Sequence, residues 1–164
     1  MALTSSFEAL KKAIEFERGG IEYYKAAAGK AKNPGTETLF KFLVKEEEKH
    51  ERFLESLRQK LKAEDRWPAG VTIDLDVDFK LLFQEESKKI DRNVKVSTTE
   101  VEALTFALEM ENRGRAMYLD LSEKASNPEE KALYKQLADW EEGHVRLIQD
   151  FHDYYEDNGM FTEE

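Results

Sequence analysis

Two halves of the sequence repeat each other at a constant offset of 94 positions. Residues 13–24 (AIEFERGGIEYY) align with residues 107–118 (ALEMENRGRAMY) and keep a glutamate, a glycine and a tyrosine in register. Residues 43–50 (LVKEEEKH) align in the same way with residues 137–144 (LADWEEGH), where a leucine, a pair of glutamates and a histidine recur. A period of this length is too long for the unit of a solenoid. We therefore expect one helical hairpin to occur twice.

Each half shows the pattern of two long amphipathic helices. Apolar residues recur at steps of three and four, and only 8 glycines and 3 prolines interrupt the chain. Helix starts are indicated by capping-box spacing at residues 5–8 and 97–100, by Asn33-Pro34 and by Asn127-Pro128, and Asn158-Gly159 indicates a helix end. The predicted helices span residues 5–32, 35–64, 98–126 and 128–157.

The linking segment between the two hairpins is long. We expect a hairpin at residues 5–64, a crossover at 65–96 and a second hairpin at 97–158, all within a single domain of residues 1–164. In the crossover, residues 71–79 alternate apolar and polar as an extended segment would, and residues 79–90 indicate a short helix capped by Asp78. The predicted fold is an all-α antiparallel four-helix bundle with a long crossover between helices two and three.

Glutamate and histidine interrupt the apolar stripes at equivalent depths. Glu17 lies 16 residues before Asn33 and His50 lies 17 after it, so an antiparallel hairpin brings them level. The second hairpin repeats this arrangement around Asn127. The predicted metal ligands are Glu17, Glu47, His50, Glu111, Glu141 and His144.

Four buried carboxylates need compensating positive charge. An unpaired buried carboxylate costs several kcal/mol, and mutual repulsion adds to that cost. Two divalent cations would balance four negative charges, and the two Glu-x-x-His pairs let one helix face offer both an oxygen and a nitrogen ligand. Oxygen and nitrogen ligands suit iron, manganese or zinc. The pattern therefore predicts a two-metal site.

Composition argues against several other classes of function. The formal net charge is -10 and the pI is about 5.0, which disfavours binding to nucleic acids and to anionic membranes. The chain has no cysteine, so thiolate metal sites and thiol catalysis are excluded. We find neither an apolar run long enough to span a membrane nor a signal-peptide pattern, and we expect a cytoplasmic location.

The residues of the repeat resemble the rubrerythrin-like members of the ferritin-like superfamily. The resemblance rests on Glu17 with Gly20 and Tyr24, Glu47 with His50, Glu111 with Gly114 and Tyr118, and Glu141 with His144. It implies a ferritin-like bundle with two iron ions that react with peroxide or dioxygen. It also implies a homodimer or larger homo-oligomer and an external electron-donor protein.

The chain departs from that family at three points. Full rubrerythrins carry a cysteine-ligated rubredoxin domain, whereas this chain has no cysteine, so any electron relay must be another protein. Peroxidase-type members have an extra carboxylate one turn after the helix-three ligand, where this chain has Gly114. Bacterioferritin-like members can bind haem through a methionine, but Glu48 follows the helix-two glutamate here, so we expect no haem.

Tyr24 and Tyr118 lie two turns after Glu17 and Glu111 on the same predicted faces. Both repeats keep tyrosine rather than phenylalanine, so we expect the hydroxyls to hydrogen-bond ligand carboxylates and to take part in catalysis; simple core packing is the alternative. The main functional hypothesis is a di-iron oxidoreductase. The alternatives are a ferroxidase or iron-storage protein, and a non-enzymatic binding module stabilised by metal.

Overall fold

The computed structural model describes residues 2–71 and 78–162, with side chains from residue 5 onward. Most of the described chain is helical. The elements, in chain order, are α1 (Ala2–Lys30), α2 (Pro34–Glu64), α3 (Phe79–Glu86), the 3-10 helix η1 (Ser87–Lys89), α4 (Thr98–Lys124) and α5 (Pro128–Asp157).

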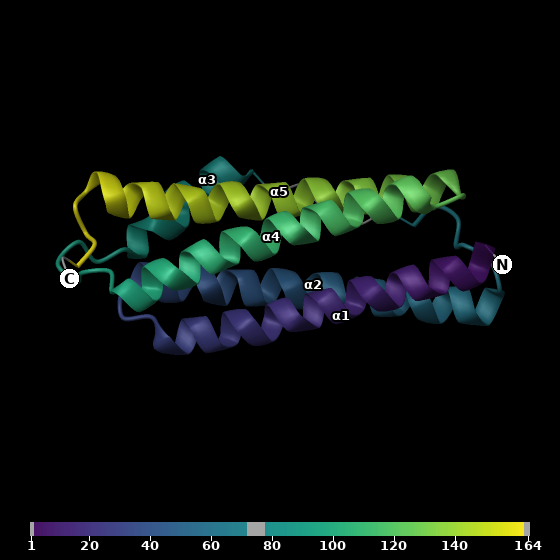
Figure 1. Cartoon of the computed structure of the whole chain (residues 1–164), viewed down its shortest axis with the longest axis horizontal. Coiled ribbons are helices and arrows are strands. Elements are labelled where there is room, and N and C mark those ends of the chain that lie inside the picture. Colours follow the sequence, from purple (N-terminus) through teal and green to yellow (C-terminus); the bar gives the residue numbers. More distant parts are fainter. Residues whose placement is uncertain (1, 72–77, 163–164) are drawn as a thin grey trace.

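The four long helices form an antiparallel bundle of two hairpins (Figure 1). α1 and α2 make one hairpin, α4 and α5 make the other, and the crossover returns along the length of the bundle before α4 begins. Because of that return, each long helix is antiparallel to its neighbour in the other hairpin as well. The predicted all-α bundle of two repeated hairpins is confirmed.

Local capping fixes where most of the helices begin. Asn33 and Asn127 cap α2 and α5, each followed by a proline in the first turn, and Ser97 forms a reciprocal capping box with Glu100 at the start of α4. The predicted start of the first helix was wrong. α1 begins at Ala2, so Ser6 lies inside it, and its hydroxyl donates a hydrogen bond to Glu130 Oε2 at 2.7 Å.

The crossover places a short helix against the second hairpin. Asp78 caps α3 by accepting hydrogen bonds from the backbone amides of Lys80 and Leu81, as predicted. The expected single helix at 79–90 is an α-helix only to Glu86 and continues as η1. Figure 1 shows α3 lying beside α5. Of the predicted extended segment at 71–79, residues 72–77 lie outside the described residues.

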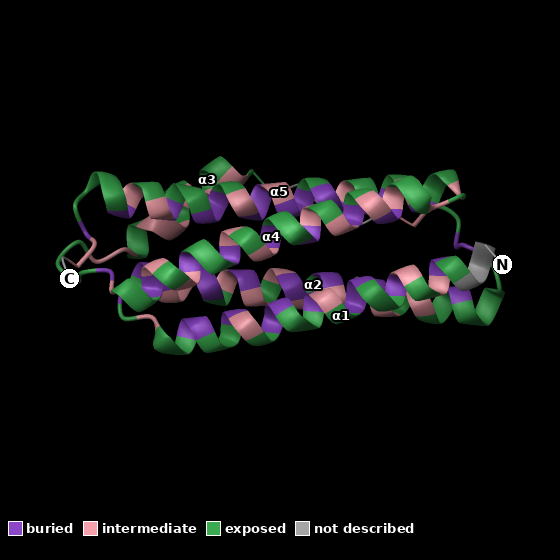
Figure 2. Cartoon of the chain, in the orientation of Figure 1, coloured by how far each residue is buried: buried purple, intermediate pink, exposed green. Residues whose placement is uncertain are grey.

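The interior contains two apolar clusters, one toward each end of the bundle. The first includes Leu10, Ile14, Leu57, Leu61, Leu133 and Leu137, and the second includes Leu39, Phe40, Leu43, Leu104, Ile148 and Phe151. Buried residues follow the inward faces of all four long helices (Figure 2). The bundle is thus packed at both ends, and the polar residues of the repeat lie between the two clusters.

Candidate metal centre

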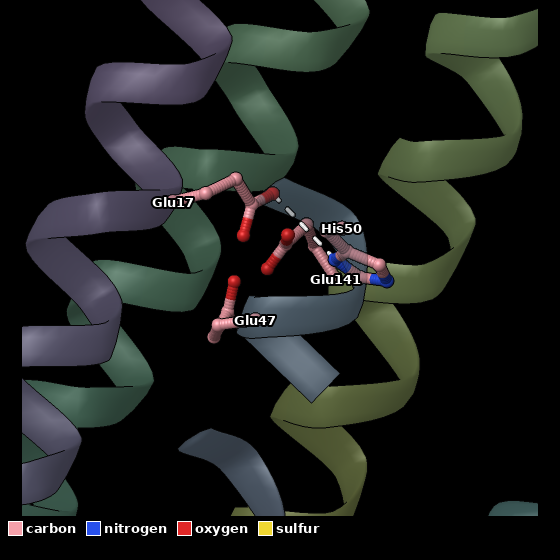
Figure 3. Close-up of side chains that lie close together, drawn as sticks. All are labelled: Glu17, Glu47, His50 and Glu141. Carbon is pink, nitrogen blue, oxygen red and sulfur yellow. Dashed lines mark ion pairs between the residues drawn. The ribbon is translucent and has the colours of Figure 1, made fainter. Parts of the chain in front are cut away.

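All six predicted ligands point into the bundle, and they come from all four long helices. Glu17 lies on α1, Glu47 and His50 on α2, Glu111 on α4, and Glu141 and His144 on α5. None is more than 2% exposed. Figure 3 shows four of them, from three helices, directed toward one another. The structure therefore brings the predicted residues together at one depth.

Their ligand atoms form two overlapping groups. The first contains Glu17, Glu47, His50 and Glu141, and the second contains Glu47, Glu111, Glu141 and His144. Within each group, one nitrogen or carboxylate oxygen from every residue lies within 4.8 Å of all the others. Glu47 and Glu141 belong to both groups. This is the arrangement expected for two neighbouring cations that share two carboxylates.

Many of these ligand atoms lack a hydrogen-bond partner among the described residues. They include both nitrogens of His50 and of His144, both carboxylate oxygens of Glu141, and one oxygen each of Glu17, Glu47 and Glu111. The imidazoles do lie near carboxylates, with His50 Nδ1 3.5 Å from Glu17 Oε1 and His144 Nδ1 3.4 Å from Glu111 Oε2. Buried polar atoms are normally paired. A set of unpaired oxygens and nitrogens that converge on one region fits divalent cations.

The pKa values of two buried carboxylates also indicate negative charge that lacks compensation. Burial raises the pKa of Glu141 well above its ordinary value, and the neighbouring Glu111 carboxylate raises it further. Burial also opposes ionisation of Glu111, but the neighbouring His144 and the hydrogen bond from Tyr24 lower its pKa to about 2. The opposite shifts of the two pKa values favour a proton on Glu141 beside an ionised Glu111 in the absence of a cation.

Two buried tyrosines connect the hairpins at this level. The Tyr24 hydroxyl of α1 donates to Glu111 Oε1 of α4, and the Tyr118 hydroxyl of α4 donates to Glu17 Oε1 of α1. Burial and the adjacent carboxylates raise the pKa of both hydroxyls well above the usual value, so both remain donors. The predicted hydrogen bonds to ligand carboxylates are present. Each tyrosine reaches across to the other hairpin rather than to the glutamate of its own helix.

The model of the rubrerythrin family matches residues 8–97 and 102–163, which include most of both hairpins and all six residues of the centre. The chain belongs to the rubrerythrin family. Searches among curated proteins and among solved structures gave no match. None of the helices in the described part of the chain has the length and hydropathy of a membrane span.

Aromatic rings cover the histidine side of the centre. The Trp140 ring stands edge-on to His50 and His144, with centroid distances of 5.3 and 5.7 Å. Phe79, the first residue of α3, lies 5.9 Å from the His144 ring. A Cβ on Gly143 would come within 2.1 Å of the Phe79 ring, so the glycine makes room for it. The sequence alone did not indicate this role of Phe79, because Phe79 lies in the crossover and its partners lie on α5 of the second hairpin.

The opposite side of the centre, between α1 and α4, is less evenly covered. A Cβ on Gly114 would come within 2.6 Å of the Phe16 ring and 3.5 Å of Glu141 Cδ. A Cβ on the equivalent Gly20 would have Glu47 as its nearest neighbour, at 3.7 Å. The two glycines occupy the same place in the repeat, yet only Gly114 is covered by an aromatic ring.

Proposed function

We propose that this member of the rubrerythrin family is a di-iron oxidoreductase that reduces peroxide or dioxygen with electrons from a separate donor protein. The observation that supports it most is the convergence of four carboxylates and two imidazoles, buried and largely without partners, inside a bundle of this family. When bound, two iron ions would supply the redox chemistry, which protein side chains do not offer. Manganese or zinc would suit the same ligands.

The residues divide naturally between two ions. Glu17 and His50 would bind one ion, and Glu111 and His144 the other, since each pair belongs to only one of the two ligand groups. Glu47 and Glu141, which belong to both groups, could contribute to the binding of both ions. Four carboxylates against two divalent cations give a neutral centre, which removes the cost of burying the charges.

The remaining residues orient the ligands and exclude water. Tyr24 and Tyr118 hold Glu111 and Glu17 through one oxygen each, which leaves the second oxygen of each carboxylate for a metal. Trp140 and Phe79 shield the imidazoles from solvent. We propose that a separate protein delivers the electrons. We also propose that the chain acts in the cytoplasm as a homodimer or larger homo-oligomer, as the resemblance to the family implies.

Iron loading followed by mixing with an oxidant tests the proposal. The protein is loaded anaerobically, its iron is counted, and hydrogen peroxide or dioxygen is added with a reductant present. We expect two iron ions per chain and sustained consumption of the oxidant. The Glu17→Ala/Glu111→Ala variant should lose iron and turnover together, whereas Glu142→Ala, on an exposed part of α5, should keep both.

Three results would count against the proposal. Fewer than two ions per chain would contradict the site itself. Full loading without turnover would favour the binding-module alternative, and accumulation of a ferric mineral inside a large shell would favour iron storage.

A further inference from the structure

An apolar groove runs between α1 and α4, on the side of the centre opposite the histidines. Its lining is mostly apolar and includes Phe16, Gly20 and Tyr23 of α1 and Phe106, Met110 and Met117 of α4, and three charged side chains also line it. At one end of this groove, Tyr23 donates a hydrogen bond to the Ala103 carbonyl oxygen at 2.8 Å, and its ring lies 4.7 Å from that of Phe106. These contacts of Tyr23 hold α1 and α4 together at that end of the groove.

Gly20 is where the groove reaches the metal centre. The glycine is buried, and the atoms nearest to a Cβ built on it are Glu47 Cγ and Cδ at 3.7 Å and Oε2 at 3.9 Å. Glu47 is 2% exposed, and its Oε2 has no hydrogen-bond partner among the described residues. A missing side chain thus leaves space between an apolar groove and an unpaired carboxylate of the centre.

The same position in the second half of the repeat is closed. The Phe16 ring fills the space beside Gly114, where a Cβ would have only 2.6 Å. The residue equivalent to Phe16 in the repeat is Met110, which also lines the groove. The repeat therefore places glycine at two equivalent positions. The Phe16 ring blocks the one at Gly114, whereas Gly20 lines the groove.

We propose that the oxidant reaches the metal pair through this groove past Gly20, and that Phe16 blocks the equivalent route past Gly114. The inference rests on the proposed di-iron function and limits the size of its oxidant. A Cβ on Gly20 would already be in van der Waals contact with Glu47, so the missing side chain leaves space of the size of a methyl group, which suits dioxygen or hydrogen peroxide but not a bulky organic hydroperoxide. The mostly apolar lining of the groove favours a neutral molecule.

Nitric oxide binding to the anaerobic di-ferrous protein tests this route, because nitric oxide is a neutral diatomic molecule and needs no turnover. Gly20→Leu should slow its binding about tenfold, which corresponds to an added barrier of about 1.4 kcal/mol. Gly29→Leu is the matched control, since Gly29 lies on the same helix outside the groove and a Cβ there meets nothing within 4 Å. Phe16→Ala should open the second route and let cumene hydroperoxide oxidise the iron.

Iron is counted in every variant before mixing. If the wild type does not load two ions, the proposed function fails. If all variants load normally but Gly20→Leu binds nitric oxide at the wild-type rate, the route is wrong while the function stands.

Should Gly20→Leu disturb Glu47 and lose iron, xenon gives a second measurement. Crystals of the metal-free wild-type protein under xenon pressure should show an atom in the groove beside Gly20. Its absence there would overturn the inference.

Discussion

At the scale of single residues, the centre combines groups that destabilise the metal-free protein with groups that position ligands. Tyr24 and Tyr118 belong to the second kind, because each satisfies one oxygen of a buried carboxylate on the other hairpin. Glu141 belongs to the first kind, because burial and its acidic neighbours raise its pKa. Substitution of a tyrosine should therefore weaken metal binding, whereas substitution of Glu141 should stabilise the metal-free protein.

Removing a tyrosine hydroxyl should weaken the centre. Tyr24→Phe leaves Glu111 Oε1 without its donor, and losing such a partner of a ligand lowers metal affinity by about 10–100-fold. Competition with a chelator of known affinity measures the change. Tyr155→Phe is the control, since it also removes one buried hydrogen bond, to Thr36, but acts far from the ligands. Equal metal affinities in the two variants would rule out a ligand-positioning role for Tyr24.

Neutralising Glu141 should stabilise the metal-free protein. Because its folded pKa is raised, the folded state keeps a proton that the unfolded chain releases above a pKa of about 4.3. The free energy of unfolding therefore falls as pH rises above that value, by at most about 1.4 kcal/mol per pH unit, until Glu141 itself ionises in the folded protein.

Glu141→Gln should flatten this decline and raise the Tm of the metal-free protein at neutral pH, by about 2–4 °C for each kcal/mol gained. The same variant should bind less metal. Thermal unfolding of chelated protein across the pH range measures the effect, with the exposed Glu142→Gln as control. A metal-free Glu141→Gln protein that is no more stable than wild type at pH 7 would contradict the raised pKa.

The structure brings together all six residues that the sequence suggested as ligands, because the repeat places three positions twice at equivalent depths. The sequence did not predict which carboxylate each tyrosine contacts. A helical period relates Tyr24 to Glu17 on its own helix, whereas its hydrogen bond to Glu111 depends on how the two hairpins face each other. Phe16 and Phe79 were missed for a related reason. Each fills the space beside a glycine on another element, and no local pattern records that contact.

At the scale of elements, the starts of α2, α4 and α5 were predictable to within one residue because capping is local chemistry. The limits of α1 could not be predicted as closely. It ends at Lys30 rather than near residue 32, and beyond it the amides of Lys32 and Asn33 donate to the Glu100 carboxylate at the start of α4. A contact between hairpins thus accompanies the end of this helix.

The short helix α3 should contribute to metal retention. Gly143→Ala would place a Cβ 2.1 Å from the Phe79 ring, which must then move away from His144. We expect a loss of about 1–3 kcal/mol in the free energy of unfolding, typical of overpacking, and faster extraction of metal by a chelator. Chemical denaturation and stopped-flow extraction measure the two effects.

Gly19→Ala serves as the control for this substitution, because a Cβ there meets nothing within 4 Å and alanine favours a helix. Adding Phe79→Ala to Gly143→Ala should cost less than the sum of the two single substitutions, since both act on one contact. Strict additivity would show that Phe79 and Gly143 do not interact in solution.

At the scale of the whole molecule, the two apolar clusters lie on either side of the metal centre. Buried residues of α1, α2, α4 and α5 contribute to each cluster. The helices are thus held together at both ends by contacts that involve no metal. The centre can therefore contain mutually repelling carboxylates without separating the hairpins.

Removing the metal should lower the stability of the protein without unfolding it. Ligands that bind only the folded state stabilise it by mass action, by about 2.7 kcal/mol when the free metal is at 100 times its Kd. For a domain of this size, that corresponds to a fall in Tm of about 5–11 °C on chelation.

Circular dichroism should show nearly unchanged helix content at 25 °C, in contrast to a zinc finger, whose fold depends on its metal. Returning iron should restore the Tm in wild type but not in the Glu17→Ala/Glu111→Ala variant. Complete loss of helix on chelation would mean that the end clusters are too weak to hold the bundle, and that the metal pair is part of its core.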